Sequence, residues 1–323
     1  MNAVVAVIVA ILIYPGIAAG LVAAWVLTWT RDTARATFGS LRPPGLLDGV
    51  AQLRSAFGRD TLSPVGERSP LLLIAPVLAI AAPLAVLVLL PVPGNPLVAA
   101  LGLTGDLAAE GALLLGMPLM RLLVGWAIPS PYTRLAADRG ARLLAGAVLP
   151  MVLALMALAQ QISTLQITTA DAGTTTALPL FALLTRLLAA AAFACCLPVL
   201  ARATALRDED GSLDAVAGEL TDVSGFDLVA FRIAEALQLV AVAAFFIAAF
   251  MLPLLVNASA GIRIAVWPVV LLVIALALGF WEARRGAQPA PADNRPPLSW
   301  WFGFPLLLAL FALVLAAWAA RGA

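Results

Sequence analysis

PLLLIAPVLAIAAPLAVLVLLPV, residues 70–92, contains no charged side chain. An α-helix of about 20 predominantly apolar residues crosses a hydrocarbon core of about 30 Å, so this stretch is long enough to span a membrane. Similar runs recur along the 323 residues, of which 63% are apolar and 11% charged. A soluble domain is about half apolar and about a quarter charged. The sequence therefore predicts an all-α polytopic membrane protein.

Eight membrane spans are predicted, and together they form a single integral membrane domain. They cover residues 2–29, 70–92, 99–127, 142–161, 177–201, 228–255, 263–283 and 299–320. The first stretch lacks the basic leading segment and small-residue cleavage site that are typical of a signal peptide. We therefore interpret it as a retained helix.

All 19 basic residues are arginines, and their distribution predicts the orientation of the chain. Most of them fall in the loops that follow the odd-numbered spans, at residues 30–69, 128–141, 202–227 and 284–298. On the opposite side there are only Arg263 and Arg321. Cytoplasmic loops carry the excess of basic residues. We therefore expect both termini outside, in the cytoplasmic (inner) membrane of a prokaryote.

Two of the predicted cytoplasmic loops have distinctive patterns. The loop 30–69 contains apolar residues at helical spacing, namely Leu46, Leu47, Val50, Leu53 and Phe57. This pattern indicates an amphipathic helix, which either lies on the membrane interface or lines the entrance to a cavity. The loop 202–227 contains RDEDGSLDAVAGELTD at 207–222, which holds six of the eighteen acidic residues.

Six ionisable residues fall inside or at the ends of predicted spans. A charge is costly there, so we expect each residue to have an ion-pair partner or a functional role. They are Asp106, Glu110, Arg121, Arg186, Arg232 and Glu235. Asp106 and Glu110 share a helix face, and Arg232 and Glu235 are spaced to pair within one helix. Two interpretations remain open: internal ion pairs that hold helices together, or a polar track that carries protons or contacts a ligand.

Several classes of function are disfavoured by what the sequence lacks. It has no histidine, and its two cysteines, Cys195 and Cys196, are adjacent in an apolar run, so we predict no metal site and no cofactor bound by this chain. No phosphate-binding, serine-hydrolase or zinc-protease signature occurs. The arginines follow the inside-positive pattern and form no basic groove, so we predict no nucleic-acid binding.

The segment DAVAGELTDVSGFDLVAFRIAEALQLV, residues 214–240, resembles part of a membrane subunit of bacterial NADH–quinone oxidoreductase, the one known as subunit 1 in complex I. In that register Ser224-Gly225 and Glu235 match family positions, as do the acids Asp210, Asp214 and Asp222. Residues 45–79 and TGDLAAEGALLLG at 104–116 are similar to the family's first loop and third span. The same superfamily includes the membrane subunit of energy-converting nickel–iron hydrogenases and formate hydrogenlyases. The VLPM segment at 148–151 is similar to those relatives, with Leu149 in place of an acid.

This resemblance implies a membrane-anchor and coupling subunit of a redox-driven ion pump. Its partners would be the iron–sulfur and large subunits of a hydrophilic arm, antiporter-like membrane subunits and the lipid bilayer. Iron–sulfur clusters and any nickel–iron site would lie on those partners, which would make this chain non-catalytic or a quinone-site subunit. The implied proton or coupling path comprises Asp210, Asp214, Glu219, Asp222, Glu235, Arg232, Asp106, Glu110, Arg121 and Arg186.

The resemblance also implies a candidate quinone cavity, lined by Leu46, Leu47, Val50, Leu53 and Phe57. The alternatives are the equivalent subunit of a hydrogenase-like complex without quinone and, in a different class, a stand-alone secondary transporter.

Overall fold

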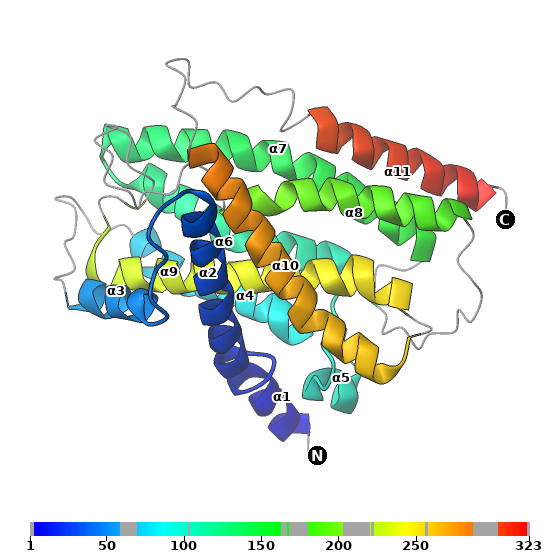
Figure 1. Ribbon diagram of the computed structural model, residues 1–323, viewed down its shortest axis with the longest axis horizontal. Coiled ribbons are helices and arrows are strands. Elements are labelled where there is room, and N and C mark those ends of the chain that lie inside the picture. Colours follow the sequence, from blue (N-terminus) through cyan, green and yellow to red (C-terminus); the bar gives the residue numbers. More distant parts are fainter. Residues whose placement is uncertain are drawn as a thin grey trace.

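The helices of this chain form one bundle in the computed structural model, which describes residues 3–58, 70–102, 104–162, 167, 180–202, 220, 223–255, 258–286 and 303–321 (Figure 1). The α-helices are α1 (Ala3–Leu12), α2 (Ile17–Phe38), α3 (Asp48–Phe57), α4 (Pro70–Leu89), α5 (Pro96–Leu101), α6 (Leu107–Ala127), α7 (Pro131–Ile162), α8 (Leu180–Leu200), α9 (Gly225–Phe246), α10 (Ala260–Gly286) and α11 (Phe304–Arg321). A π-helical turn, η1 (Ile247–Met251), and a 3₁₀ turn, η2 (Leu252–Leu255), extend α9.

The prediction of an all-α polytopic membrane protein is confirmed. Among the described residues, seven helical segments are long and apolar enough to cross a membrane when α1 and α2 are taken as one, and α9 with its η turns as another. A shorter apolar helix, Phe304–Ala319 within α11, adds a further candidate.

The first helix differs from its predicted range of 2–29. The chain breaks between α1 and α2 at Pro15, whose ring nitrogen has no hydrogen to donate to a helical carbonyl. Beyond the break α2 continues to Phe38, so the first part of the predicted loop 30–69 is helical and includes Arg31 and Arg35. Within this continued part of α2, Arg31 is buried and lies near an acid on α10, Glu282.

Two further boundaries move for local reasons. The third span begins at Leu107 rather than at 99, because Gly102 ends the short α5 in the left-handed conformation (φ 64°). Asp106 then caps α6 by accepting a hydrogen bond from the Ala108 N–H at 2.7 Å. The fourth span begins at Pro131 rather than at 142, since α7 runs without interruption from Pro131 to Ile162. Proline is favoured at the start of a helix, where its missing N–H has no helical partner to lose.

Helix α9, together with its η turns, is the central element, because 78% of an apolar 18-residue stretch within Gly225–Leu255 is buried inside the protein. It packs against α2, α4, α6 and α8, while α7, α8 and α11 lie together on one side and α2 packs along α10 (Figure 1). Small residues allow the close contacts between helices, since Gly116 of α6 lies against Ala82 of α4 and Gly279 of α10 lies against the α2 backbone. Such close approach is the usual basis of helix association in a bilayer.

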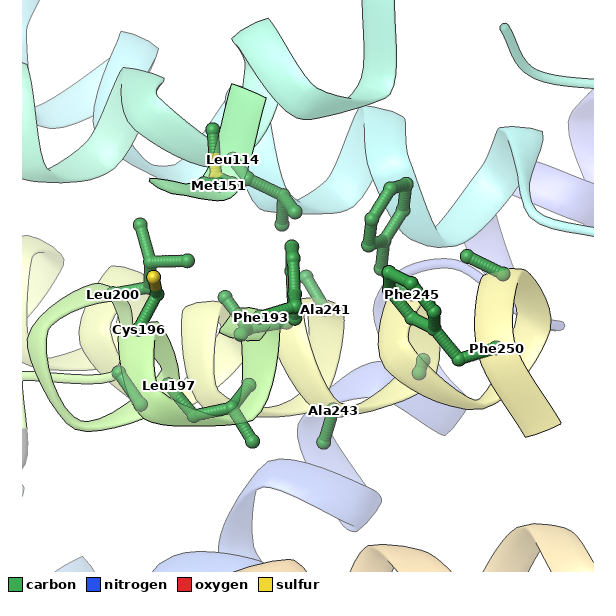
Figure 2. Close-up of a cluster of buried hydrophobic side chains, with 14 of the residues drawn as sticks. Leu114, Met151, Phe193, Cys196, Leu197, Leu200, Ala241, Ala243, Phe245 and Phe250 are labelled. Atoms are coloured by element: carbon green, nitrogen blue, oxygen red, sulfur yellow. The ribbon is translucent and has the colours of Figure 1, made fainter. Parts of the chain in front are cut away.

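The end of α9 is fixed by a cluster of aromatic rings. Phe193 of α8 lies 5.5 Å from the ring of Phe245 and 5.4 Å from that of Phe250, measured between centroids. Phe246 also packs on Phe250, at 5.5 Å. Figure 2 shows Phe193, Phe245 and Phe250 in the same buried cluster as Leu114 and Met151. The cluster therefore ties α8 to the segment where α9 changes from α-helical to π-helical winding.

Described contacts near helix ends mark two opposite ends of the bundle. At the first, which we call the α3 end, Phe57 of α3 contacts Phe226 at the start of α9, and Ile128 after α6 packs in a cluster with Leu220. At the second, the α5 end, the Gly105 N–H donates to the Leu89 carbonyl and the Gly105 carbonyl accepts from Ile167.

Candidate functional site

The centre of the candidate site is an ion pair between two membrane-spanning helices. Arg121 of α6 donates from Nη1 to Oε2 of Glu235 on α9, and the two atoms are 2.9 Å apart. The side chains are only 7% and 15% exposed. Opposite charges that are buried in contact stabilise one another, whereas either charge alone would be costly there. The sequence singled out both residues but matched Glu235 with Arg232, so the partner on another helix is a finding of the structure.

A second link between α6 and α9 lies along the same pair of helices. Pro118 of α6 lacks the N–H that would normally bond to the carbonyl four residues earlier, which is that of Leu114. The side chain of Gln238 on α9 supplies the missing donor, with Nε2 lying 2.6 Å from the Leu114 oxygen. Proline is tolerated in membrane helices when a neighbouring helix satisfies the freed carbonyl in this way. Gln238 is fully buried, and sequence reasoning missed it because an amide carries no charge.

The third polar group is Glu110, in the first turn of α6 at the α5 end. Its side chain is fully buried, and among the described residues neither carboxylate oxygen has a hydrogen-bond partner. The carboxylate lies against the Cα of Gly105, where the Cβ of any larger residue would overlap Oε1. The glycine is therefore required for Glu110 to occupy this place. Asp106, which was predicted to share a face with Glu110, caps the helix and is half-buried.

These groups follow one line along α6. Glu110, Leu114 and Arg121 are spaced by four and seven residues, which places them on one face of the helix. On α9 the partners Glu235 and Gln238 are three residues apart and lie in antiparallel order to Arg121 and Leu114. The α6–α9 interface therefore carries charged or amide groups from near the α5 end to the α3 half of the bundle.

Of the remaining predicted members of the proton or coupling path, Arg232 and Arg186 lie on described helices. Arg232 is half-buried on α9, one turn before Glu235. Arg186 is buried on α8, where Nε has no hydrogen-bond partner among the described residues. The acids Asp210, Asp214, Glu219 and Asp222 lie outside the described residues.

The predicted quinone-cavity residues lie on and just before α3. Leu46, Leu47, Val50 and Phe57 are between 49% and 65% exposed, and Leu53 is half-buried. Trp25 of α2 holds the segment before α3 by donating its indole N–H to the Leu46 carbonyl at 3.0 Å. In the isolated chain these apolar side chains thus form an outer surface at the α3 end.

A second group of buried charges lies between α2 and α10 and was not anticipated. Arg31 is 1% exposed, with Nε 3.4 Å from Oδ1 of Asp32 and 4.0 Å from Oε1 of Glu282. Gly279 lets the α10 backbone approach Arg31 closely. Sequence reasoning placed Arg31 in the loop 30–69, because the uncharged stretch that predicts the first span ends just before this residue.

Comparison with known proteins gives a family match and similarities to solved structures. A family model described as NADH dehydrogenase matches residues 4–320. The chain is also similar to a chain of the membrane-bound sulfane sulfur reductase, an archaeal respiratory membrane complex, with a TM-score of 0.74 and 20% identity. That similarity covers 96% of this chain and 99% of the other, and at this identity it bears on the fold alone. No curated protein sequence matches the chain.

Proposed function

Because the chain belongs to the NADH dehydrogenase family, as a subunit of the complex I subunit 1 type, we propose that it anchors and couples a redox-driven ion pump in the membrane. In this proposal the chain transfers no electrons itself. It joins a hydrophilic arm that carries iron–sulfur clusters to antiporter-like membrane subunits. The structural similarity to a chain of an archaeal respiratory membrane complex is consistent with a subunit of such an assembly.

The observation that carries the proposal is the buried Arg121–Glu235 pair between α6 and α9. Charged groups inside a membrane are expensive, and they characteristically mark ion or proton pathways. The guanidinium stabilises the ionised carboxylate, and a change in the local charge alters this stabilisation, so that the carboxylate can take up a proton and later release it. A redox event on a partner at the α3 end would change that local charge.

The proposed orientation is supported by the distribution of arginines between the two ends of the bundle. The α3 end carries Arg42, Arg54, Arg134 and Arg202, so we assign it to the cytoplasm, both termini to the outside and the protein to a prokaryotic inner membrane. The hydrophilic arm would then dock at α3 and at the acidic segment 202–227. Asp210, Asp214, Glu219 and Asp222, which lie in this acidic segment of the sequence, remain proposed members of the coupling path.

A quinone is a second candidate ligand at the α3 end. Phe57 and Phe226 meet edge to face at 6.2 Å, and Leu46, Leu47 and Val50 beside them are exposed. A docked arm would enclose this apolar surface, either around a quinone or against protein as in a hydrogenase-like complex. Photolabelling of the assembled complex with an azido-quinone distinguishes these two arrangements, since only the first labels α3.

The test of the main proposal begins with purification of the native assembly. A tag on this chain in its source organism, with extraction in mild detergent, is expected to recover partner subunits that show iron–sulfur signals by electron paramagnetic resonance. Inverted membrane vesicles, driven by NADH or by dithionite-reduced methyl viologen, are then expected to show ion pumping that Glu235→Gln abolishes while assembly persists. A chain that purifies alone, as a stand-alone transporter would, contradicts the proposal. Wild-type pumping by Glu235→Gln removes the coupling role.

A further inference from the structure

The side chain of Gln238 is fully buried, and among the described residues only one of its two polar atoms makes a hydrogen bond. Its Nε2 donates to the Leu114 carbonyl that Pro118 leaves free, which fixes the orientation of the amide group. Its Oε1 is consequently turned away from that carbonyl, and it has no partner among the described residues. A buried acceptor of this kind ordinarily binds an ordered water molecule or another donor.

Gln238 lies between two carboxyl groups of the proposed coupling path, Glu110 and Glu235. Leu114, which holds the amide, lies one helical turn from Glu110 on the same face of α6. Glu110 is also fully buried, and both its oxygens lack a partner among the described residues. On α9, Gln238 lies one turn from Glu235. The amide therefore lies between Glu110 and Glu235 along the α6–α9 interface, since Glu235 pairs with Arg121, about three helical turns beyond Glu110 on α6.

We propose that Gln238 is a positioning residue that holds water between Glu110 and Glu235, and so joins the two halves of the polar line across the membrane. The inference rests on the proposed coupling function. A proton that leaves the Glu110 carboxyl enters this water, and the water gives up another proton to the Glu235 carboxylate. One carboxyl is then ionised and the other protonated, the water is unchanged, and one positive charge has moved along the α6–α9 interface. The reverse transfer uses the same groups.

Pro118 makes a test possible in which the structural role of Gln238 is separated from the relay role. In Gln238→Leu the Leu114 carbonyl loses its donor, so the variant is expected to be both less stable and less coupled. When Pro118→Ala is added to Gln238→Leu, the backbone N–H gained at position 118 can bond to the Leu114 carbonyl within α6. The double variant is therefore expected to regain thermal stability, while the water-holding acceptor is still missing.

The readout is the number of protons moved per electron in inverted membrane vesicles, driven by NADH or by dithionite-reduced methyl viologen. Because this ratio is taken per electron, a smaller number of fully assembled complexes does not change it. We expect both variants to lower the ratio by about tenfold or more, the change in a rate constant that about 1.4 kcal/mol produces. Thr185→Val is the matched control, since Thr185 is equally buried and, among the described residues, its hydroxyl bonds within α8, to the Phe181 carbonyl. It is expected to keep the wild-type ratio.

Each outcome decides the question. A reduced ratio in both Gln238 variants, with the control unchanged, supports the relay. A wild-type ratio in Gln238→Leu, or a ratio restored together with stability in the double variant, means that Gln238 only supports the helix and overturns the inference. If Glu235→Gln lowers the ratio and Gln238→Leu does not, the inference alone fails. If Glu235→Gln also keeps the wild-type ratio, the proposed function fails.

Discussion

Neutralising one member of the Arg121–Glu235 pair should destabilise the protein far more than neutralising both. At 2.9 Å and an effective dielectric constant of about 20, the attraction between unit charges is roughly 6 kcal/mol. Removing one partner of a buried pair costs about 3–5 kcal/mol, because the other charge is left uncompensated. For a protein of this size a loss of that order lowers the melting temperature by on the order of 5–10 °C.

The assay follows from the position of the two thiols. Cys196 is 1% exposed and Cys195 is half-buried, so a thiol-reactive fluorescent dye reports unfolding of the detergent-solubilised chain. We expect Arg121→Gln and Glu235→Gln each to lower the melting temperature by the amount above. The double variant is expected to recover most of the loss, since two neutral amides can hydrogen-bond across the same gap. The exposed Arg54→Gln should stay within about 0.5 kcal/mol of wild type. Losses that simply add in the double variant would refute the claim that the two charges stabilise each other.

Three further substitutions test the packing, each by the same thermal assay. Gly279→Ala places a Cβ against the α2 backbone and should cost about 1–3 kcal/mol, whereas Gly261→Ala, with nothing within 4 Å of its Cβ, is a control expected to be neutral or stabilising. Phe193→Ala empties the aromatic cluster and should cost about 3–5 kcal/mol, so a loss below about 1 kcal/mol would show that the rings do not hold α8. Gly105→Ala pushes a Cβ into the Glu110 carboxylate, and adding Glu110→Ala should restore part of its stability. A double variant less stable than Gly105→Ala would contradict that clash.

The ends of helices were harder to predict than their existence. Uncharged runs such as 70–90 correspond to helices, because only a helix or a closed barrel satisfies backbone groups in lipid. The uncharged stretch of the first span ends at Arg31, yet α2 continues past this residue to Phe38. The acid that accommodates Arg31, Glu282, is some 250 residues away in sequence. No local pattern reveals such a partner.

In the candidate site, likewise, the sequence could indicate which residues matter but not how they pair. The charges of Arg121, Glu235 and Glu110 stand out in apolar sequence, so the sequence could nominate them. It could not pair them, since residues three apart in one helix and residues on different helices are equally compatible with the spacing. Gln238 could not be found in this way, because its role depends on a carbonyl that Pro118 frees on another helix.

By itself the sequence determined that this chain is a bundle of membrane helices and which of its side chains are costly to bury. The physical reason is that transfer of apolar and charged groups between water and lipid depends on each residue alone, and so can be read along one dimension. Only the tertiary structure decided that Arg121 meets Glu235, that Gln238 completes α6 and that Glu110 fits against Gly105. Those contacts depend on how close two helices approach, which is set by small residues and prolines on both of them together.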